Sequence, residues 1–367
     1  MKLCKNIPYI NTVYRNVMGL NRKEVKKFYE NISNADCIIP IGEGRSQCAL
    51  YIGLRNINRD VKMTEAIDFP GENMEEAARI LEKKYSRISL LVNSGSGETT
   101  NPKRVVEELV RYIDKSGSDS FTIDAIVSDS NSTIGRRSRE YGSSIILAGR
   151  EETPESSSEY MKHGIMNDIY ELGSLIFIQK IKEAVNLGLN NGLFEKIDEE
   201  MRIIAKLVDN FVELEIYDSI VDNLEKRGHV IVGGTGIARI VSLMSVIRLQ
   251  HVKRAIGDEA YLTGPLAPRP RAGDTVFLVS WSGENETLLK WMEESKIFCA
   301  DTYSITGRDS TLSRNTDSYV IPSEPSEFYM RAAFVLSPIP LSLVDKLASR
   351  GLNLPEYIMG WYHSVTQ

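Results

Sequence analysis

The stretch from Ile88 to Thr99 reads ISLLVNSGSGET, an apolar run that ends abruptly in a turn of serines and glycines. The run 88–92 has the length of a buried strand, and Pro102 beyond the turn is typical of the first turn of a helix. A strand that passes through a tight polar turn into a helix is the repeating step of a parallel sheet. The stretch therefore predicts one such step of an α/β domain.

Apolar runs of strand length alternate with helical patterns over most of the chain. Helices at 161–186 and 198–226 carry apolar residues at helical spacing and connect two sets of strands. Alternation of this kind is typical of a parallel sheet covered by helices on both faces. We therefore predict an α/β protein of doubly wound, flavodoxin-like parallel sheets. Besides 88–92, the predicted strands are 37–41, 122–127, 144–147, 229–232 and 275–279.

Three features of the first half return in the second half in the same order, and three ordered matches predict an internal duplication. A chain of 367 residues is also long enough for two cores. We expect two tandem domains, residues 1–195 with N-terminal and connector helices and residues 196–367 with a C-terminal tail. The matched features are the glycine turns 42–46 and 233–236, the serine turns 94–99 and 280–285, and the Ser-Thr pairs at 132 and 310.

Composition narrows the classes of partner. The net charge of −6 and a pI near 5.5 argue against a broad nucleic-acid surface, but a small anion can still meet local donors. The four cysteines form no CxxC pair, so we expect buried thiols, no metal and a reducing cytoplasm. We find neither a secretory leader nor an apolar run that would cross a bilayer, and predict no membrane partner.

The serine turn has the chemistry of a phosphate site. A loop between a strand and a helix offers backbone N–H groups and the positive end of the helix, and Ser94, Ser96 and Thr99 add hydroxyls. Gly95 and Gly97 permit a tight turn and a close approach of the anion to the backbone. The alternative is a polar turn in which Thr99 merely caps the helix.

A second turn is expected beside the first. Ser46 lies in Gly42-Glu43-Gly44-Arg45-Ser46, which also follows a strand, and neighbouring parallel strands bring their turns to one edge of a sheet. Arg45 is interpreted as solvated or structural, since serine and backbone donors already suffice for a phosphate. The two turns together predict one pocket.

These turns resemble the two signature turns of the sugar isomerase (SIS) domain family, and the second is a close match. The resemblance covers nearly the whole chain as two SIS domains, as in the isomerase part of glucosamine-6-phosphate synthase and related amino-sugar-phosphate deaminases. It implies that Ser46, Ser94, Ser96 and Thr99 hold a substrate phosphate and that no cofactor is needed. Three further stretches are similar to that enzyme, namely 148–151, 264–267 and 364–366, while 169–177 resembles a helix of single-domain phosphohexuloisomerases.

Departures from the family fall where its chemistry is expected. Thr263 and His363 stand in place of a histidine and a lysine, and 248–251, which aligns near the catalytic glutamate, holds no carboxylate. The second serine turn departs as well, with Trp281 at the variable position and Asn285 in place of threonine. We therefore expect the second domain to be structural, or to close over the first domain's site.

Moving a proton between neighbouring sugar carbons through an enediol requires a carboxylate or an imidazole, and no metal. The candidates are Glu171, which matches the glutamate of the phosphohexuloisomerase helix, Glu259 before the Gly-Pro-Leu segment, and His363 in the tail. An exposed or helix-capping glutamate is the alternative for Glu171. His251 is expected to be packed, and His163 has no support.

The sequence predicts a cytoplasmic homodimer that binds a small phosphorylated sugar and interconverts an aldose and a ketose, with or without loss of an amino group. It does not identify the sugar. A sensor that binds the sugar phosphate without turnover is the main alternative. A dinucleotide enzyme is disfavoured because Arg239 stands where the third glycine of the fingerprint belongs, and neither glycine turn has the Gly-Lys-Ser/Thr of a P-loop.

Overall fold

The computed structural model describes residues 2–149, 168–189 and 192–352. These residues group into two compact units. The first unit consists of residues 12–149, 169–189 and 192–199, and the second unit of residues 2–11, 168 and 200–352. Among the described residues the chain changes unit at 11–12, within the first helix, at 168–169 and at 199–200. The predicted domain boundary at residues 195–196 stays a prediction.

The first unit is built around one parallel sheet. Its sheet has the order β2-β1-β3-β4-β5, and every pair of neighbouring strands is parallel. The elements in chain order are α1 (Pro8–Met18), α2 (Arg22–Asn34), β1 (Cys37–Gly42), α3 (Gly44–Gly53), β2 (Asp60–Val61), α4 (Met74–Leu81), β3 (Ile88–Asn93), α5 (Thr100–Ser116), β4 (Phe121–Val127), α6 (Thr133–Tyr141), β5 (Gly142–Ile146) and α8 (Ile169–Leu187).

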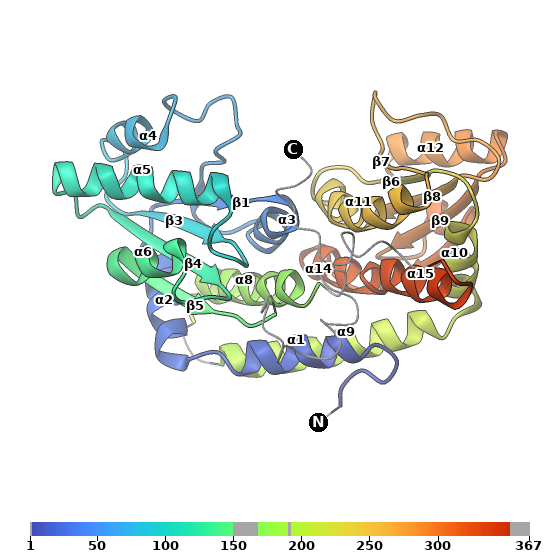
Figure 1. Cartoon of the computed structure of the whole chain (residues 1–367), viewed down its shortest axis with the longest axis horizontal. Helices are drawn as coiled ribbons and strands as arrows, with labels where there is room; N and C mark the ends of the chain where they lie inside the picture. The colour runs from blue at the N-terminus through green and yellow to red at the C-terminus, as the bar shows by residue number, and fades with distance from the viewer. Residues whose placement is uncertain (1, 150–167, 190–191, 353–367) are drawn as a thin grey trace. The chain divides into compact units, whose positions relative to one another are not determined.

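Helices cover both faces of this sheet, so the central strands β1 and β3 are buried along their whole length. On one face, side chains of β1, β3 and β4 pack against α4, α5 and α6 in one apolar cluster. On the other face lie α2, α3 and α8 (Figure 1). A strand buried on both faces must be apolar throughout, which explains the unbroken runs in the sequence.

The second unit repeats this plan. Its sheet has the order β10-β9-β8-β6-β7, again with parallel neighbours throughout. Leu288, Met292 and Leu312 pack on one face of the sheet. The elements are α9 (Leu193–Val212), which begins in the first unit, then α10 (Glu215–Glu225), β6 (Val230–Gly233), α11 (Ile237–Ala255), β7 (Ala260–Leu262), β8 (Thr275–Ser280), α12 (Glu286–Ile297), β9 (Asp301–Thr306), α13 (Thr311–Arg314), β10 (Asp317–Val320), α14 (Pro325–Leu336) and α15 (Pro338–Ser349).

The two sheets have the same topology. Numbered within its own unit, each sheet runs 2-1-3-4-5, the flavodoxin-like order. The predicted α/β class with two doubly wound parallel sheets is therefore confirmed, and the matched turns of the sequence occupy matched positions. Ligands of such sheets bind beyond the carboxyl ends of the strands, where the strand order reverses, which is between β1 and β3 and between β6 and β8.

One long predicted helix is in fact two. The expected helix at 198–226 is interrupted, because Leu214 has an extended backbone and caps α10. Phe211 packs its ring against Tyr217 beyond the break, with centroids 5.2 Å apart, and against Tyr319 at 4.9 Å. Tertiary packing of the aromatic rings therefore overrides the continuous apolar pattern.

Two expectations from composition need correction. Cys4, Cys37 and Cys48 are buried as expected, but Cys299 is exposed at the end of α12. The stretch Pro325–Ser349, which comprises α14 and α15, is long and apolar enough to cross a bilayer, contrary to the expectation that no such run exists. Most of it is buried inside the protein, as in a core helix, and Ser337 separates α14 from α15, which begins at Pro338.

Candidate phosphate-binding site

The serine turn that follows β3 gathers three hydroxyl groups. Thr99 Oγ1 lies 3.0 Å from Ser94 Oγ and 3.4 Å from Ser96 Oγ. Ser94 is buried, Thr99 is partly exposed and Ser96 is exposed, so the cluster opens from the sheet toward solvent. These are the three side chains that the sequence singled out, and the structure brings them together.

Thr99 stands at the N-cap of the 17-residue helix α5 but makes no side-chain cap hydrogen bond. Its hydroxyl bonds Ser94 and Ser96 instead. The alternative in which Thr99 merely caps the helix is therefore wrong. The positive end of α5 and three hydroxyls meet in one turn, which is the combination that binds an oxyanion.

Gly97 and Glu98 hold the turn against the next strand-to-helix connection. Gly97 has φ of 64°, and a Cβ there would overlap the Ser132 hydroxyl. A Glu98 carboxylate oxygen accepts a hydrogen bond from the Thr133 amide at 2.5 Å, in the first turn of α6. Although burial raises the pKa of Glu98, this amide and Lys103 outweigh it, and the pKa is lowered overall. Gly97 and Glu98 thus have structural tasks in the turn.

The Ser46 turn lies beside the serine turn, as predicted. β1 and β3 are hydrogen-bonded neighbours, and the Asn93 side-chain amide donates to the Ser46 carbonyl at 2.9 Å. Ser46 and Arg45 are both buried in the first turn of α3. Burial contradicts the interpretation of Arg45 as solvated and agrees with a structural role. The pair of turns sits at the reversal of strand order, where this fold binds ligands.

The matched turn of the second unit uses its polar atoms differently. Ser280 Oγ accepts from the Gly283 amide at 3.0 Å, and the Asn285 side chain caps α12 at Leu288. The Trp281 indole donates to the Ser323 carbonyl, and the Arg308 guanidinium lies over its ring. Ser280 and Asn285 thus stabilise their own turn. That the second unit is structural, or closes over the first unit's site, stays a prediction.

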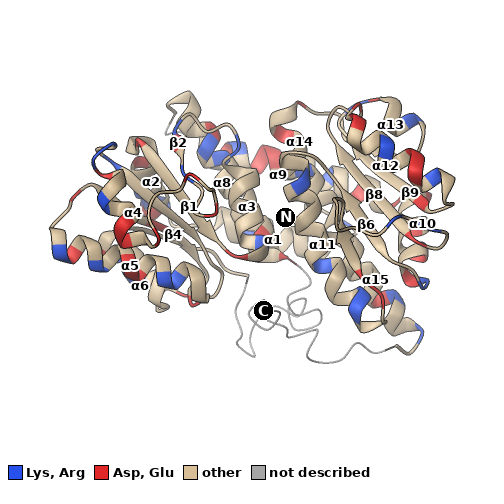
Figure 2. Ribbon diagram, turned by 90° about the horizontal axis from the view of Figure 1, so that it is seen from above, with Lys and Arg blue, Asp and Glu red and all other residues tan. Residues whose placement is uncertain are grey.

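Charge elsewhere is mixed. Figure 2 shows basic and acidic residues interspersed on the outer helices of each unit, for example on α5 and α12.

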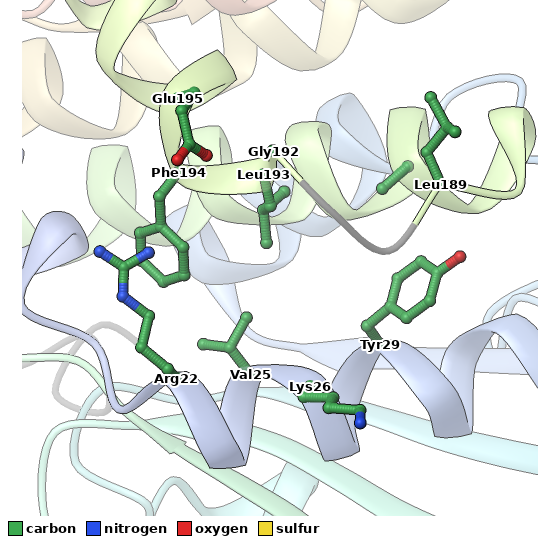
Figure 3. A pocket seen from close by; sticks show the side chains of 10 residues that line it. Arg22, Val25, Lys26, Tyr29, Leu189, Gly192, Leu193, Phe194 and Glu195 are labelled. Atoms are coloured by element: carbon green, nitrogen blue, oxygen red, sulfur yellow. The ribbon is translucent and has the colours of Figure 1, made fainter.

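A separate pocket of about 350 Å³ lies in the first unit. Val25 and Leu193 line it, and the Arg22 guanidinium stacks on Phe194 at 3.3 Å from the ring centroid (Figure 3). It adjoins the carboxyl end of α8 at Ala184, whereas the serine turns meet the opposite end of that helix.

Comparison with solved structures identifies the fold. No family model and no curated protein sequence matches significantly. The C-terminal domain of glucosamine-fructose-6-phosphate aminotransferase from Francisella tularensis has a TM-score of 0.57 at 17% identity, covering 94% of both chains. Tagatose-6-phosphate ketose/aldose isomerase from Escherichia coli has a TM-score of 0.62 at 12% identity, covering 95% of this chain and 94% of that one. This chain has the double SIS fold.

A third SIS structure is similar over its whole length. Glucosamine-6-phosphate deaminase from Thermotoga maritima has a TM-score of 0.51 at 17% identity, covering 94% of this chain and 96% of that one. The resemblance that the sequence motifs predicted is therefore confirmed at the level of the fold. The serine turn 94–99 and the Ser46 turn lie at the carboxyl ends of the neighbouring strands β3 and β1 of the first sheet, and their role in binding phosphate stays a prediction.

Of the three predicted proton-transfer groups, the structure brings one near the serine turn 94–99 and the Ser46 turn. Glu171 is in the first turn of α8 and is buried, so the exposed alternative is wrong. Its neighbour Tyr170 donates a hydrogen bond to Asn93 Oδ1 at 2.7 Å, which places this turn of α8 at the serine turn. Glu259 lies before β7, at the amino end of that strand, and pairs with Arg254 at 3.1 Å. His363 lies outside the described residues, as does His163.

Sequence reasoning missed the polar residues under the turn. Asn93 ends β3 and is fully buried, and it contacts Tyr170 and Ser174 of α8. The available signal was a polar residue closing an apolar strand, together with Tyr and Ser four positions apart in an apolar helix. His251 is buried in α11, as expected for a packed histidine.

Proposed function

We propose that the first unit binds a hexose or amino-hexose phosphate and catalyses aldose-ketose isomerisation, with the amino-sugar deamination of related proteins as a variant of the same chemistry. The observation that carries the proposal is the convergence of Ser94, Ser96 and Thr99 hydroxyls at the N-terminus of α5. Ser46 and the glycines Gly95 and Gly97 complete the cradle. Similar folds that belong to a phosphosugar isomerase and a phosphosugar deaminase support the substrate class.

In the proposed reaction, Glu171 moves the proton. Its carboxylate takes the hydrogen from the sugar carbon beside the carbonyl, and the carbonyl oxygen gains a proton from water to give an enediol. The conjugate acid then returns the proton to the former carbonyl carbon while the hydroxyl on the neighbouring carbon gives its proton back to water and becomes the new carbonyl, so that aldose and ketose exchange with no net change in atoms. Glu171 lies on the same face of α8 as Ser174, three residues on, and the Ser174 hydroxyl contacts Asn93 under the phosphate turn.

Glu171 is preferred to Glu259 as the base. Glu259 is held by Arg254 and lies at the amino end of β7, whereas SIS ligands are expected at carboxyl ends of strands. His363 stays a candidate for opening the sugar ring on sequence grounds alone.

The phosphate assignment is tested with the triple variant Ser94→Ala, Ser96→Ala, Thr99→Ala. We expect calorimetric binding of fructose 6-phosphate to be lost, because the variant lacks all three hydroxyls. The matched control is Ser280→Ala, Ser282→Ala, Asn285→Ala in the second unit, which is expected to keep the affinity. Unchanged affinity in the first variant would refute the site.

Turnover is tested by mixing fructose 6-phosphate with the protein in D₂O and detecting glucose, mannose or glucosamine 6-phosphate, the last with ammonia present. An enediol route carries solvent deuterium into the sugar. Glu171→Gln should retain binding and lower the rate of deuterium incorporation by about 10²- to 10⁴-fold, the usual contribution of a general base. Full activity in Glu171→Gln would remove that residue from the mechanism.

A sugar-phosphate sensor is the second candidate, and one observation favours it. Arg248, in the segment that aligns near the family's catalytic glutamate, is fully buried and pairs with Asp168 at 2.5 Å. That segment therefore offers a structural ion pair in place of a carboxylate base. Thermal stabilisation by fructose 6-phosphate without turnover would select the sensor.

We also propose that the protein is a cytoplasmic homodimer, since the SIS resemblance implies that such chains form pairs. Sedimentation equilibrium should give about twice the monomer mass of 41.3 kDa. A monomer at all concentrations would exclude the dimer and leave the binding proposal untouched.

A further inference from the structure

Asn93 joins three parts of the first unit through one side chain. Its amide nitrogen donates to the Ser46 carbonyl at 2.9 Å and to the Ser174 hydroxyl at 3.0 Å. Its amide oxygen accepts from the Tyr170 hydroxyl at 2.7 Å. Asn93 itself is the residue before Ser94, so the serine turn, the Ser46 turn and the first turn of α8 meet at this amide.

The network is buried and its bonds continue into the sheet. Asn93, Tyr170 and Ser174 are fully buried, and Ser46 is 5% exposed. The Tyr170 hydroxyl also lies 2.7 Å from the Ile126 carbonyl of β4, which accepts from the Ser94 amide as well. The Ser174 hydroxyl donates to the Glu171 carbonyl at 3.1 Å. Buried polar groups with satisfied bonds fix one arrangement, because any shift leaves a donor or acceptor without a partner in a dry interior.

The asparagine amide suits these partners. It donates to the Ser46 carbonyl and offers the Tyr170 hydroxyl an acceptor beside the Ile126 carbonyl, and it carries donor and acceptor on neighbouring atoms. Aspartate would lack the donor, and leucine would lack both. Asn93 at the end of β3 therefore has the specific task of bonding the Ser46 carbonyl and the Tyr170 hydroxyl at once.

We infer that Asn93 is a positioning residue that couples the two phosphate turns to the α8 turn that carries Glu171. A phosphate held by Ser94 and its neighbours is thereby set at a fixed distance from the proton-transfer group. The inference rests on the proposed function for its consequence in catalysis, while the positioning itself is a property of the ligand-free protein. Asn93 acts through Ser46, Ser174 and Tyr170 and does not touch the sugar.

The test uses variants that remove different bonds of this network. Asn93→Leu is the direct change, and Tyr170→Phe and Ser174→Ala are the milder ones should Asn93→Leu not fold. The matched control is Tyr112→Phe, which loses a buried tyrosine's bond to Glu82 in the same unit. Tyr112 lies near the end of α5, far along the helix from Thr99 at its start.

Amide hydrogen exchange of the ligand-free full-length protein is the first measurement. In Tyr170→Phe and Ser174→Ala, peptides that contain residues 43–50 and 94–101 should exchange several-fold faster than in the wild type, and they should be unchanged in Tyr112→Phe. Equal exchange in all four proteins, with similar loss of Tm in the variants, would overturn the inference whether or not a sugar binds.

Kinetics with fructose 6-phosphate is the second measurement. Ser174→Ala should lower kcat about tenfold and change KM by less than about twofold, since it disturbs the approach of the base and leaves the phosphate donors in place. A general loss of stability would not produce this split. A wild type that neither binds nor converts sugar phosphates would refute the proposed function alone, and the exchange data would still decide the role of Asn93.

Discussion

Ser96 and Ser282 occupy matched positions in the two units, and comparing their alanine variants separates an effect on stability from an effect on ligand binding. Ser96 Oγ accepts a hydrogen bond from the Glu98 amide at 3.2 Å, and Ser282 Oγ accepts one from the Glu284 amide at 3.3 Å. Ser96 alone also reaches a second hydroxyl, that of Thr99 at 3.4 Å. Replacing each serine by alanine removes the same local bond, so the two variants should lose similar stability, about 1 kcal/mol or less at such exposed positions.

The affinity for fructose 6-phosphate should distinguish the two variants. A hydrogen bond to a charged group contributes about 1.5 to 3 kcal/mol, so Ser96→Ala should weaken the binding of fructose 6-phosphate by about 10- to 150-fold. Ser282→Ala should leave the dissociation constant within about twofold. Titration calorimetry gives both constants, and urea denaturation checks that the two variants are equally stable. Equal affinities for the ligand would contradict the assignment of the phosphate to the first unit's turn.

Three further predictions follow from the geometry of the turns and the core. Gly97→Ala and Gly283→Ala should each cost about 1 to 3 kcal/mol in urea denaturation, since both glycines have positive φ and a Cβ would overlap the Ser132 or Ser310 hydroxyl; a neutral result at either site would show that the turn can relax. Burial raises the pKa of the Cys4, Cys37 and Cys48 thiols to about 12, so at about pH 8 a thiol reagent should label only the exposed Cys299 rapidly, with all four labelled in denaturant. Burial raises the pKa of Glu98, but the Thr133 amide and Lys103 lower it by more, so the stabilisation from Glu98 is present above its unfolded pKa of about 4.5 and is lost as the pH falls through the lower folded value. Glu98→Gln should therefore be less stable than the wild type at about pH 7, and the difference in urea denaturation should shrink as the pH falls below about 4.5.

The strands that the sequence predicted are those whose own residues demand burial. β3 and β8 are mostly apolar and are buried along their whole length, so the pattern alone places them to within a residue or two. β2 has two residues, Asp60 and Val61, neither buried, and exists because β1 offers a free edge for pairing. A two-residue strand is too short to show a periodic pattern in the sequence, and the three residues of β7 are nearly too few as well. Edge strands depend on their neighbours more than on their own residues.

The candidate site divides in the same way. Ser94, Ser96 and Thr99 were predictable because their chemistry is local to one turn. Asn93 was not, since its partners Ser46, Tyr170 and Ser174 are far from it in sequence, and only the fold brings them to the end of β3. Glu171 was predictable as a candidate from its resemblance, but its burial depends on the packing of α8.

The Ser-Gly-Glu segment occurs in both units, and comparing the two copies separates the contacts that fold the turn from those that the first unit alone has. Glu284 accepts from the Thr311 amide at 2.8 Å as Glu98 does from Thr133, and Gly283 packs against Ser310 as Gly97 does against Ser132. The glycine and the glutamate recur with the same contacts in a turn that lacks the hydroxyl cluster, so folding alone accounts for their presence. The two turns differ at the residue that precedes the helix. Asn285 caps its helix, whereas Thr99 leaves the helix uncapped and bonds Ser94 and Ser96. The residue matched to Leu288 is Pro102, which has no N–H to donate to a side-chain cap, so the Thr99 hydroxyl is left to the cluster with Ser94 and Ser96 at the start of α5.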